Sequence, residues 1–167
     1  MIQQHYNIIG VMSGTSLDGV DLAHLQFHIT NQNWSFEILE CETIPYSESW
    51  VQQLKSAVNY NQNQLQELNQ NYTQLLGQII AAFIEKHQIK NIDAVCSHGH
   101  TILHQPQNGF TLQIGNLAEI AAYCKQTVVC DFRVQDVKLG GQGAPLVPIG
   151  DRILFAAYDY CLNLGGF

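Results

Sequence analysis

Residues 10–21 combine glycines, hydroxyls and carboxylates in one short stretch, GVMSGTSLDGVD. Glycine accepts positive φ and lets a backbone approach a ligand closely, and consecutive N–H groups in such a turn can bind an anion. The hydroxyl donors of the stretch are Ser13, Thr15 and Ser16. Asp18 and Asp21 are carboxylates that can hold a hard cation such as Mg²⁺. The pattern predicts a phosphate-binding hairpin, although an ordinary glycine-rich turn has the same composition.

A second group that can do chemistry lies near the end of the chain. Asp131, Arg133 and Asp136 precede the glycine-rich run Gly140-Gly141-Gln142-Gly143. A carboxylate at a strand end, beside a glycine-rich loop, can take a proton next to a bound phosphate. Phosphoryl transfer asks the protein mainly for positioning and charge stabilisation. Asp131 has an alternative role, as a buried structural carboxylate paired with Arg133.

Neither glycine-rich stretch is a Walker-type loop, because that pattern needs Gly-Lys-Ser/Thr at the start of a helix and no lysine lies near residues 10–21. A phosphate held there therefore needs its charge offset by backbone dipoles and a metal ion.

Four stretches in this order resemble the anhydro-N-acetylmuramic acid kinases. They are residues 11–21, residues 97–102 with His104 and Pro106, residues 112–116, and residues 131–148. That family belongs to the sugar kinase, heat-shock protein and actin superfamily, whose members close two lobes over ATP. The resemblance implies an α/β fold, an actin-like ATPase (ribonuclease H-like) lobe with a mixed sheet. It also implies that residues 1–167 form the first lobe and that the second lobe is absent from this chain.

The resemblance implies an enzyme that uses ATP and Mg²⁺ to open 1,6-anhydro-N-acetylmuramic acid hydrolytically and to phosphorylate O6. The product is N-acetylmuramic acid 6-phosphate, a step in cell-wall sugar recycling. The resemblance makes Asp136 the general base. It places the phosphates of ATP against Ser13, Gly14, Thr15, Ser16, Leu17, Asp18, Gly19, Gly140 and Gly141. It places the sugar against His98, His100, Asp131, Arg133, Gln113 and Asn116, with Asp18 as the Mg²⁺ ligand.

The histidines His98, His100 and His104 support a competing hypothesis. His98 and His100 would share one face of an extended strand, and with Asp131 or Asp136 they could form the metal site of a hydrolase. The resemblance favours histidines that line a polar cleft and donate hydrogen bonds to a sugar. A non-catalytic sugar-binding module is a third hypothesis.

Composition narrows the partners. The formal net charge is −7, which argues against nucleic acid or an anionic membrane as a partner. The five cysteines are widely spaced, and we interpret them as reduced core residues rather than a disulfide framework. No basic-then-apolar leader is present, so we expect a cytoplasmic protein that binds small molecules. Self-association is expected where surface for the second lobe lies open.

The elements that must position these groups follow from periodicity. Alternation predicts an antiparallel meander of three strands around residues 6–12, 23–29 and 34–38, with His24 and His28 on its solvated face. Apolar residues at helical spacing predict a helix after Ser47, which is the predicted N-cap. They predict a second, longer helix from Asn63 to about His87, and Asn63 has capping-box spacing to Gln66. Strands are expected at 92–97, 110–114, 127–130 (buried) and 160–164. We expect a helix over 117–124 capped by Asn116, a functional loop over 132–144, and a helix over 152–157.

Overall fold

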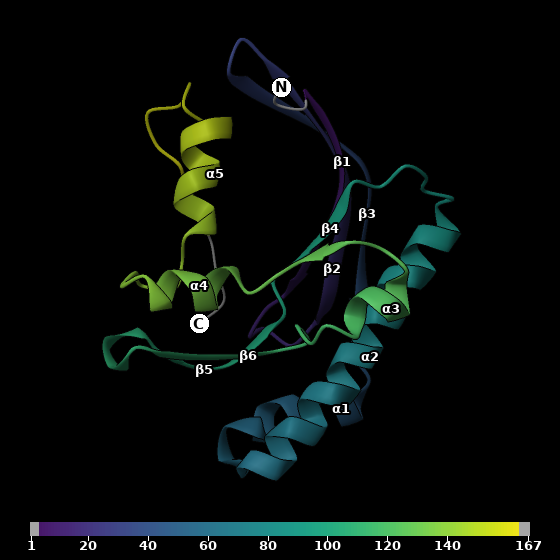
Figure 1. Ribbon diagram of the computed structural model, residues 1–167, viewed down its shortest axis with the longest axis vertical. Helices are drawn as coiled ribbons and strands as arrows, with labels where there is room; N and C mark the ends of the chain where they lie inside the picture. The colour runs from purple at the N-terminus through teal and green to yellow at the C-terminus, as the bar shows by residue number, and fades with distance from the viewer. Residues whose placement is uncertain (1–3, 164–167) are drawn as a thin grey trace.

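The computed structural model describes residues 4–163 and shows a mixed α/β architecture (Figure 1). Five strands of this part of the chain form one sheet in the order β3-β2-β1-β4-β7, and β5 and β6 form a separate two-stranded ribbon. The strands are β1 (His5–Ser13), β2 (Gly19–Thr30), β3 (Asn33–Pro45), β4 (Ala94–Ser97), β5 (His100–Gln105), β6 (Phe110–Ile114) and β7 (Val128–Val129). The α-helices are α1 (Glu48–Ser56), α2 (Gln62–Lys86), α3 (Ile120–Cys124), α4 (Phe132–Lys138) and α5 (Leu146–Leu154). The mixed sheet and its flanking helices confirm the predicted fold class.

The predicted antiparallel meander is present as β1, β2 and β3. Thr30 pairs with Asn33, so the β2–β3 turn has two central residues, Asn31 and Gln32, with φ of 51° and 70°. Positive φ at both positions matches the right-handed twist of the strands it joins. β4 and β7 then add to the sheet in parallel, β4 beside β1 and β7 beside β4.

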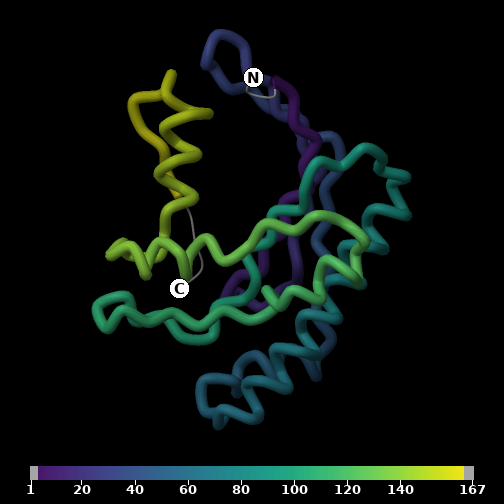
Figure 2. The backbone as a smooth tube through the Cα atoms, in the orientation of Figure 1, coloured from purple at the N-terminus to yellow at the C-terminus, as the bar shows by residue number. Residues whose placement is uncertain are grey.

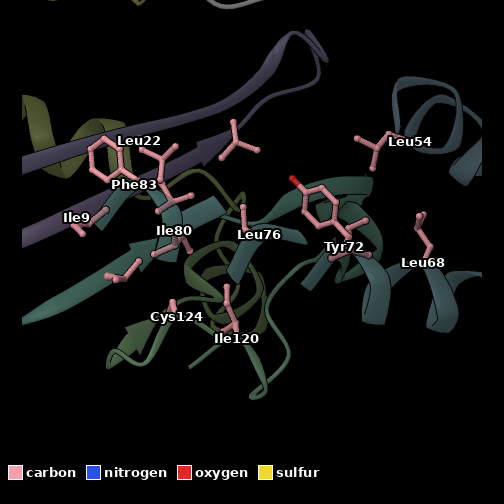
Figure 3. Packing of buried hydrophobic residues seen from close by; sticks show 14 of the residues in the cluster. Ile9, Leu22, Leu54, Leu68, Tyr72, Leu76, Ile80, Phe83, Ile120 and Cys124 are labelled. Atoms are coloured by element: carbon pink, nitrogen blue, oxygen red, sulfur yellow. The ribbon is translucent and has the colours of Figure 1, made fainter. Parts of the chain in front are cut away.

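Helix α2 covers one face of the sheet and supplies most of the core (Figures 1 and 3). Its fully buried apolar side chains are Leu68, Tyr72, Leu76, Ile80 and Phe83. They pack against the inward-facing side chains Ile9, Val11, Val20, Leu22 and Val95. This apolar burial holds the ends of β1 and β4 in place, and the candidate site lies at those ends.

The prediction that His24 is solvated is wrong. His24 is 8% exposed, and its Nε2 lies 2.6 Å from Oδ1 of Asn7. The face of β2 that packs on α2 contains Val20, Leu22 and His24, and the β2–β3 register shifts between His24 and Leu25. Since alternate residues face opposite sides of a strand, assigning the wrong face buries the residues expected to be exposed.

The kind of N-terminal cap was predicted correctly for α1 and α2, but the capping residues of α2 were not. Ser47 caps α1 as expected, since its side chain accepts a hydrogen bond from the N–H of Trp50 at 3.4 Å. The capping box of α2 is formed by Asn61 and Gln64 and not by residues 63 and 66. Both pairs have the same spacing, and Asn61 has the extended backbone (φ −73°, ψ 172°) that an N-cap requires.

Several expectations for the second half are corrected. β7 is a two-residue edge strand with Val129 43% exposed, and is not buried. Asn116 does not cap α3, which begins at Ile120 after Glu119. Strand β5 was missed, and the expected loop over 132–144 contains helix α4. Helix α5 begins six residues earlier than predicted, Tyr160–Asn163 form no strand, and the rest of that expected strand lies outside the described residues.

Helix α5 stands on the side of the sheet opposite α2 (Figures 1 and 2). Phe155, at its C-terminal end, contacts Phe36 of β3 with ring centroids 6.0 Å apart. None of the nine residues of α5 is buried, and a cavity of about 780 Å³ separates Leu146 from Gly10, Met12 and Ala23 of the sheet.

The described helices include none that is long and apolar enough to cross a membrane. All five cysteines are unpaired, and Cys124 alone among them is buried, so the expected core placement is wrong for the others.

Candidate active site

The predicted phosphate hairpin is the tight connection between β1 and β2. The N–H of Leu17 donates to the carbonyl of Gly14 at 3.3 Å, and Leu17 itself has φ of +58°. Oδ1 of Asp18 accepts from the Ser16 hydroxyl at 2.6 Å and from the N–H of Gly19 at 3.1 Å. The Ser16 hydroxyl, together with backbone N–H groups, lowers the pKa of Asp18, so the turn keeps this exposed carboxylate charged. Thr15 and Ser16 are exposed and available to a ligand.

Ser13 differs from the other hydroxyl residues of the hairpin because its side chain is buried. Its Oγ lies 2.7 Å from the hydroxyl of Tyr46 and 2.8 Å from Nδ1 of His100, and Ser13 is 2% exposed. Tyr46 is in turn 2.5 Å from the hydroxyl of Tyr72 in α2. The Ser13 hydroxyl is therefore engaged beneath the hairpin and not on its open side.

Residues 97–100 turn sharply instead of continuing as one strand. β4 ends at Ser97, β5 begins at His100, and Gly99 between them has φ of +68°. The prediction that His98 and His100 share one face of an extended strand is therefore wrong. The N–H of His98 donates to the carbonyl of Val11 at 2.9 Å, which places this turn directly beside the hairpin end of β1.

The tautomer of His98 follows from its neighbour Arg133. Nη2 of Arg133 lies 3.3 Å from Nε2 of His98, and a guanidinium has no acceptor, so Nε2 must accept. The proton of the neutral ring then sits on Nδ1, 3.0 Å from the carbonyl of Gly99. Burial lowers the pKa of His98, and the nearby Arg133 charge lowers it further, in agreement with a neutral ring.

The three histidines do not converge on a metal position. His100 bonds to Ser13, His98 to Arg133, and His104 to the Thr111 hydroxyl at 3.2 Å. Within residues 4–163, no group of three His, Cys, Asp or Glu side chains has the arrangement that could hold a metal ion. This geometry removes the basis of the metal-dependent hydrolase hypothesis, because the turn at Gly99 sends the histidines to different partners.

Asp131, predicted to contact the sugar, lies exposed beyond the end of β7. It follows β7, takes a left-handed backbone (φ +62°) at the start of α4, and is exposed. Its Oδ1 accepts from Nδ2 of Asn116 at 2.9 Å, while Arg133 contacts His98. The alternative of a buried Asp131 paired with Arg133 is wrong.

Four buried polar atoms around residues 97–99 have no hydrogen-bond partner among the described residues. They are Ser97 Oγ, Gln113 Oε1, Asn116 Oδ1 and Arg133 Nε. Gln113 approaches this turn through its Nε2, which donates to the carbonyl of His98 at 2.9 Å. Buried polar groups are nearly always satisfied by hydrogen bonds, so four unpartnered atoms around one turn are an unusual feature of this fold.

The second glycine-rich stretch wraps around the carboxylate of Asp136. The N–H of Gly143 donates to Oδ2 of Asp136 at 2.7 Å, and the N–H of Gly141 donates to its backbone carbonyl at 2.8 Å. A Cβ at Gly141 would lie 2.2 Å from Oδ2, and a Cβ at Gly143 would lie 2.7 Å from the His104 ring. Only glycine allows this loop to close on the carboxylate and on the histidine-bearing ribbon at once.

A cavity of about 170 Å³ lies beside the histidine turn, and neither Asp136 nor the predicted phosphate-binding residues 13–19, Gly140 and Gly141 line it. It is lined by Met12 next to the hairpin, by His98 and Arg133, and by Gly143 of the second loop. The structure thus brings together the hairpin flank, the histidine turn and the glycine loop at one end of the sheet. The sequence does not single out Tyr46 and Tyr72 for a part in the site, because a tyrosine at helical or strand spacing looks like an ordinary core residue.

Comparisons with known proteins identify the family of the chain. The family model "Anhydro-N-acetylmuramic acid kinase" matches residues 6–167. A protein of that name from Pseudomonas fluorescens (strain Pf0-1) is 40% identical over 167 residues, and one from Francisella tularensis subsp. novicida (strain U112) is 35% identical over 173. Each alignment covers 95% of this chain and 45% of the relative, so the chain spans less than half the length of these proteins. The chain belongs to the anhydro-N-acetylmuramic acid kinase family.

Proposed function

We propose that this chain is the first lobe of a two-lobed kinase that uses ATP to open 1,6-anhydro-N-acetylmuramic acid and to phosphorylate O6. The product is N-acetylmuramic acid 6-phosphate. Family membership supports the reaction class, and relatives bear the name of this kinase. The second lobe would lie in the part of the relatives that this chain does not cover.

The observation that carries the proposal is the contact chain from the hairpin to the glycine loop. His98 bonds the β1 end through Val11 and contacts Arg133, and Gly143, which lies against Arg133, holds Asp136. A triphosphate on the hairpin and a sugar beside His98 would therefore meet close to the Asp136 carboxylate. Phosphoryl transfer requires this placement of donor, acceptor and charge.

Asp136 is the proposed general base. Its Oδ2 is held by Gly143, and the carboxylate can take a proton from a water that attacks the anomeric carbon, as in an inverting glycosidase. The bond from that carbon to O6 breaks, and O6 takes the γ-phosphoryl group as ADP leaves. The departing O6 is captured by phosphate, so no separate general acid is required.

The exposed hairpin residues and the buried turn have separate proposed tasks. Backbone N–H groups of residues 14–19 and of Gly140 and Gly141, with the Thr15 and Ser16 hydroxyls, would hold the phosphates. His98, Arg133, Asn116 and Gln113, with Asp131 and His100, would hold the sugar, since unpartnered polar atoms lie among these residues.

Mg²⁺ belongs to the proposal as the ion that accompanies ATP. Mg²⁺ keeps several waters and binds through one or two carboxylates and the substrate phosphates, so a single protein ligand fits it. Asp18 is charged, exposed and on the hairpin, and is the residue proposed to hold the ion. When bound, Mg²⁺ would neutralise developing charge on the phosphates, which the lysine-free hairpin does not do.

We also propose that the partners are the anhydrosugar and ATP, and that neither nucleic acid nor a membrane is a partner. The proposed location is the cytoplasm. The unburied α5, with Val147 48% and Ile149 50% exposed, favours self-association of this chain. Sedimentation at increasing concentration tests this, and a monomer at every concentration would contradict it.

The decisive experiment replaces Asp136 with Asn in the full-length protein that contains this lobe. We expect the release of ADP that depends on the anhydrosugar to be lost, while the far-ultraviolet circular dichroism spectrum stays unchanged. Asp159→Asn, at an exposed carboxylate outside the site, is the matched control and should retain turnover. Normal turnover by Asp136→Asn would remove the base assignment, and an intact enzyme that never uses the anhydrosugar would remove the kinase proposal itself.

A further inference from the structure

The hydroxyls of Tyr72, Tyr46 and Ser13 form a row that ends on His100. Adjacent atoms of the row lie 2.5 Å apart from Tyr72 to Tyr46, 2.7 Å from Tyr46 to Ser13 Oγ, and 2.8 Å from Ser13 Oγ to Nδ1 of His100. The row connects the middle of α2, the residue that follows β3, the last residue of β1 and the first residue of β5. These four residues are here called the hydroxyl relay.

The direction of the hydrogen bonds in the relay follows from burial. Tyr72 is 0% exposed, and its hydroxyl has one proton, which must find an acceptor inside the protein. Tyr72 interacts with the hydroxyls of Tyr46 and Ser13, and its 2.5 Å contact with Tyr46 assigns its proton to Tyr46. Tyr46 then donates to Ser13, and Ser13 donates to Nδ1 of His100.

We propose that the hydroxyl relay locks His100 as the neutral Nε2–H tautomer and anchors the β1 end of the phosphate hairpin to the core. Ser13 is the last residue of β1, and the turn that follows it carries the predicted phosphate ligands. Ser13, Tyr46 and Tyr72 are positioning residues in this inference, and the Ser13 hydroxyl is not a phosphate ligand.

The surroundings of the relay agree with this assignment. Burial lowers the pKa of His100 to about 4, so the ring is neutral at neutral pH and one of its nitrogens can accept. Burial also raises the pKa of both Tyr46 and Tyr72, which keeps both phenols protonated as donors. The Tyr72 ring packs 5.9 Å from the His100 ring, centroid to centroid, and so closes the group.

The tautomer proposed for His100 is the opposite of the tautomer at His98. Arg133 makes Nε2 of His98 an acceptor and leaves its proton on Nδ1, whereas the relay makes Nδ1 of His100 the acceptor. Two histidines separated by one glycine are thereby held in different tautomers. His98 is thus an internal reference for the measurement.

Two-bond ¹H–¹⁵N NMR of the ¹⁵N-labelled 167-residue chain tests the tautomer directly. We expect a pyridine-type Nδ1 and a pyrrole-type Nε2 for His100, and the reverse pattern for His98. A His100→Gln variant assigns the signals. A pyrrole-type Nδ1 at His100 would overturn the proposal, whatever the behaviour of any variant.

Hydrogen exchange tests the anchor. Tyr46→Phe keeps the ring and Ser13→Ala removes only a hydroxyl, so both should retain the fold while the Leu17 amide, which donates to the Gly14 carbonyl in the hairpin, exchanges roughly tenfold faster. Tyr158→Phe removes the hydroxyl of a 70% exposed tyrosine outside the relay and should exchange like the parent chain. Parent-like hairpin exchange in both relay variants would refute the anchor.

The functional meaning of the anchor rests on the proposed phosphate role of the hairpin, but these measurements use no ATP and no sugar. A protected hairpin and the expected tautomer alongside an inactive full-length protein would reject the kinase and keep the relay. An active kinase with the wrong tautomer at His100 would do the reverse.

Discussion

The backbone N–H of Gly143 donates to Oδ2 of Asp136 at 2.7 Å, so a residue seven positions later in the chain fixes the orientation of this carboxylate. Gly141, between the two, lies so close to that carboxylate that a side chain at position 141 would collide with it. The glycine loop therefore has a steric task in addition to its predicted contact with phosphate. It holds the proposed base in one position before any substrate arrives, which is the kind of preorganisation that catalysis requires.

The first prediction follows from that contact. Gly141→Ala places a Cβ 2.2 Å from Oδ2 of Asp136 and must displace the carboxylate or the loop. A displacement of about 1 Å can cost roughly a hundredfold in rate, so we expect kcat of the full-length protein to fall by about that factor. Gly150→Ala, whose Cβ meets nothing within 4 Å, is the control and should keep the parent kcat. Equal kcat values for the two variants would show that the loop does not position the base.

A second prediction concerns Gly115, whose role the motif alone did not explain. Its φ is +90°, and a Cβ there would lie 2.8 Å from the Tyr72 ring, while its N–H donates to Oδ1 of Asn69 at 2.8 Å. Gly115→Ala should lower the free energy of unfolding by about 3 kcal/mol, through left-handed strain plus overpacking against α2.

Gly109 is the matched control for that substitution. Its φ is +65°, but a Cβ there meets nothing within 4 Å. Gly109→Ala therefore measures the strain alone, and we expect a loss of about 1 kcal/mol. Urea unfolding of both variants checks the difference, and equal losses would mean that Tyr72 moves aside without cost.

A third prediction is a loss of stability in mild acid. The pKa of His100 is about 4 in the folded chain and close to its ordinary value of 6.5 when the chain is unfolded. The unfolded state then binds more protons between those values, so the free energy of unfolding falls as pH drops from about 6.5 toward 4. One group with this shift contributes at most about 3 kcal/mol.

His100→Gln removes that titration and should flatten the same part of the stability curve. The lowered pKa values of His24 and His98 act in the same direction, so the variant should retain a smaller slope. Chemical denaturation at a series of pH values measures both curves. Parallel curves for parent and variant would show that His100 is not the buried neutral ring described above.

A fourth prediction is that the 167-residue chain alone has little or no kinase activity. The proposed mechanism closes two lobes over ATP, and this chain spans 45% of the relatives that bear the kinase name. Coupled measurement of ADP release, with ATP, Mg²⁺ and the anhydrosugar, should give the rate of the buffer blank for the chain and turnover for the full-length protein. Turnover by the chain itself would show that one lobe is sufficient.

Local patterns predicted the elements whose signals are local. Alternation identified the three antiparallel strands, and Ser47 identified the start of α1, because pleat periodicity and N-cap chemistry depend on a few neighbouring residues. The predicted box at residues 63 and 66 failed for a related reason. Asn61 and Gln64 offer the same side chains at the same spacing, and the packing of α2 on the sheet selects between the two pairs.

The wrong predictions concern residues whose burial or hydrogen-bond partner depends on contacts with other parts of the chain. His24 has the polarity of a solvated residue, yet the face of β2 that packs on α2 includes it. Helix α4 was expected to be loop because residues 132–144 are polar and end in glycines, and strand β5 was missed although its partner β6 was predicted. Asn116 has the chemistry of a helix cap, but it bonds to Asp131 instead.

The amino-acid sequence by itself determined which residue types are present for chemistry: two lysine-free glycine-rich stretches, a carboxylate before the second, and a pair of histidines around a glycine. These motifs were sufficient to indicate the family, since residue types and spacing are properties of the linear chain. The tertiary structure alone decided that Ser13 is buried beneath its hairpin, that His98 and His100 bond different partners, and that Gly143 holds Asp136. Burial and hydrogen-bond direction depend on which segments come into contact, and the packing of the sheet, α2 and α4 determines those contacts.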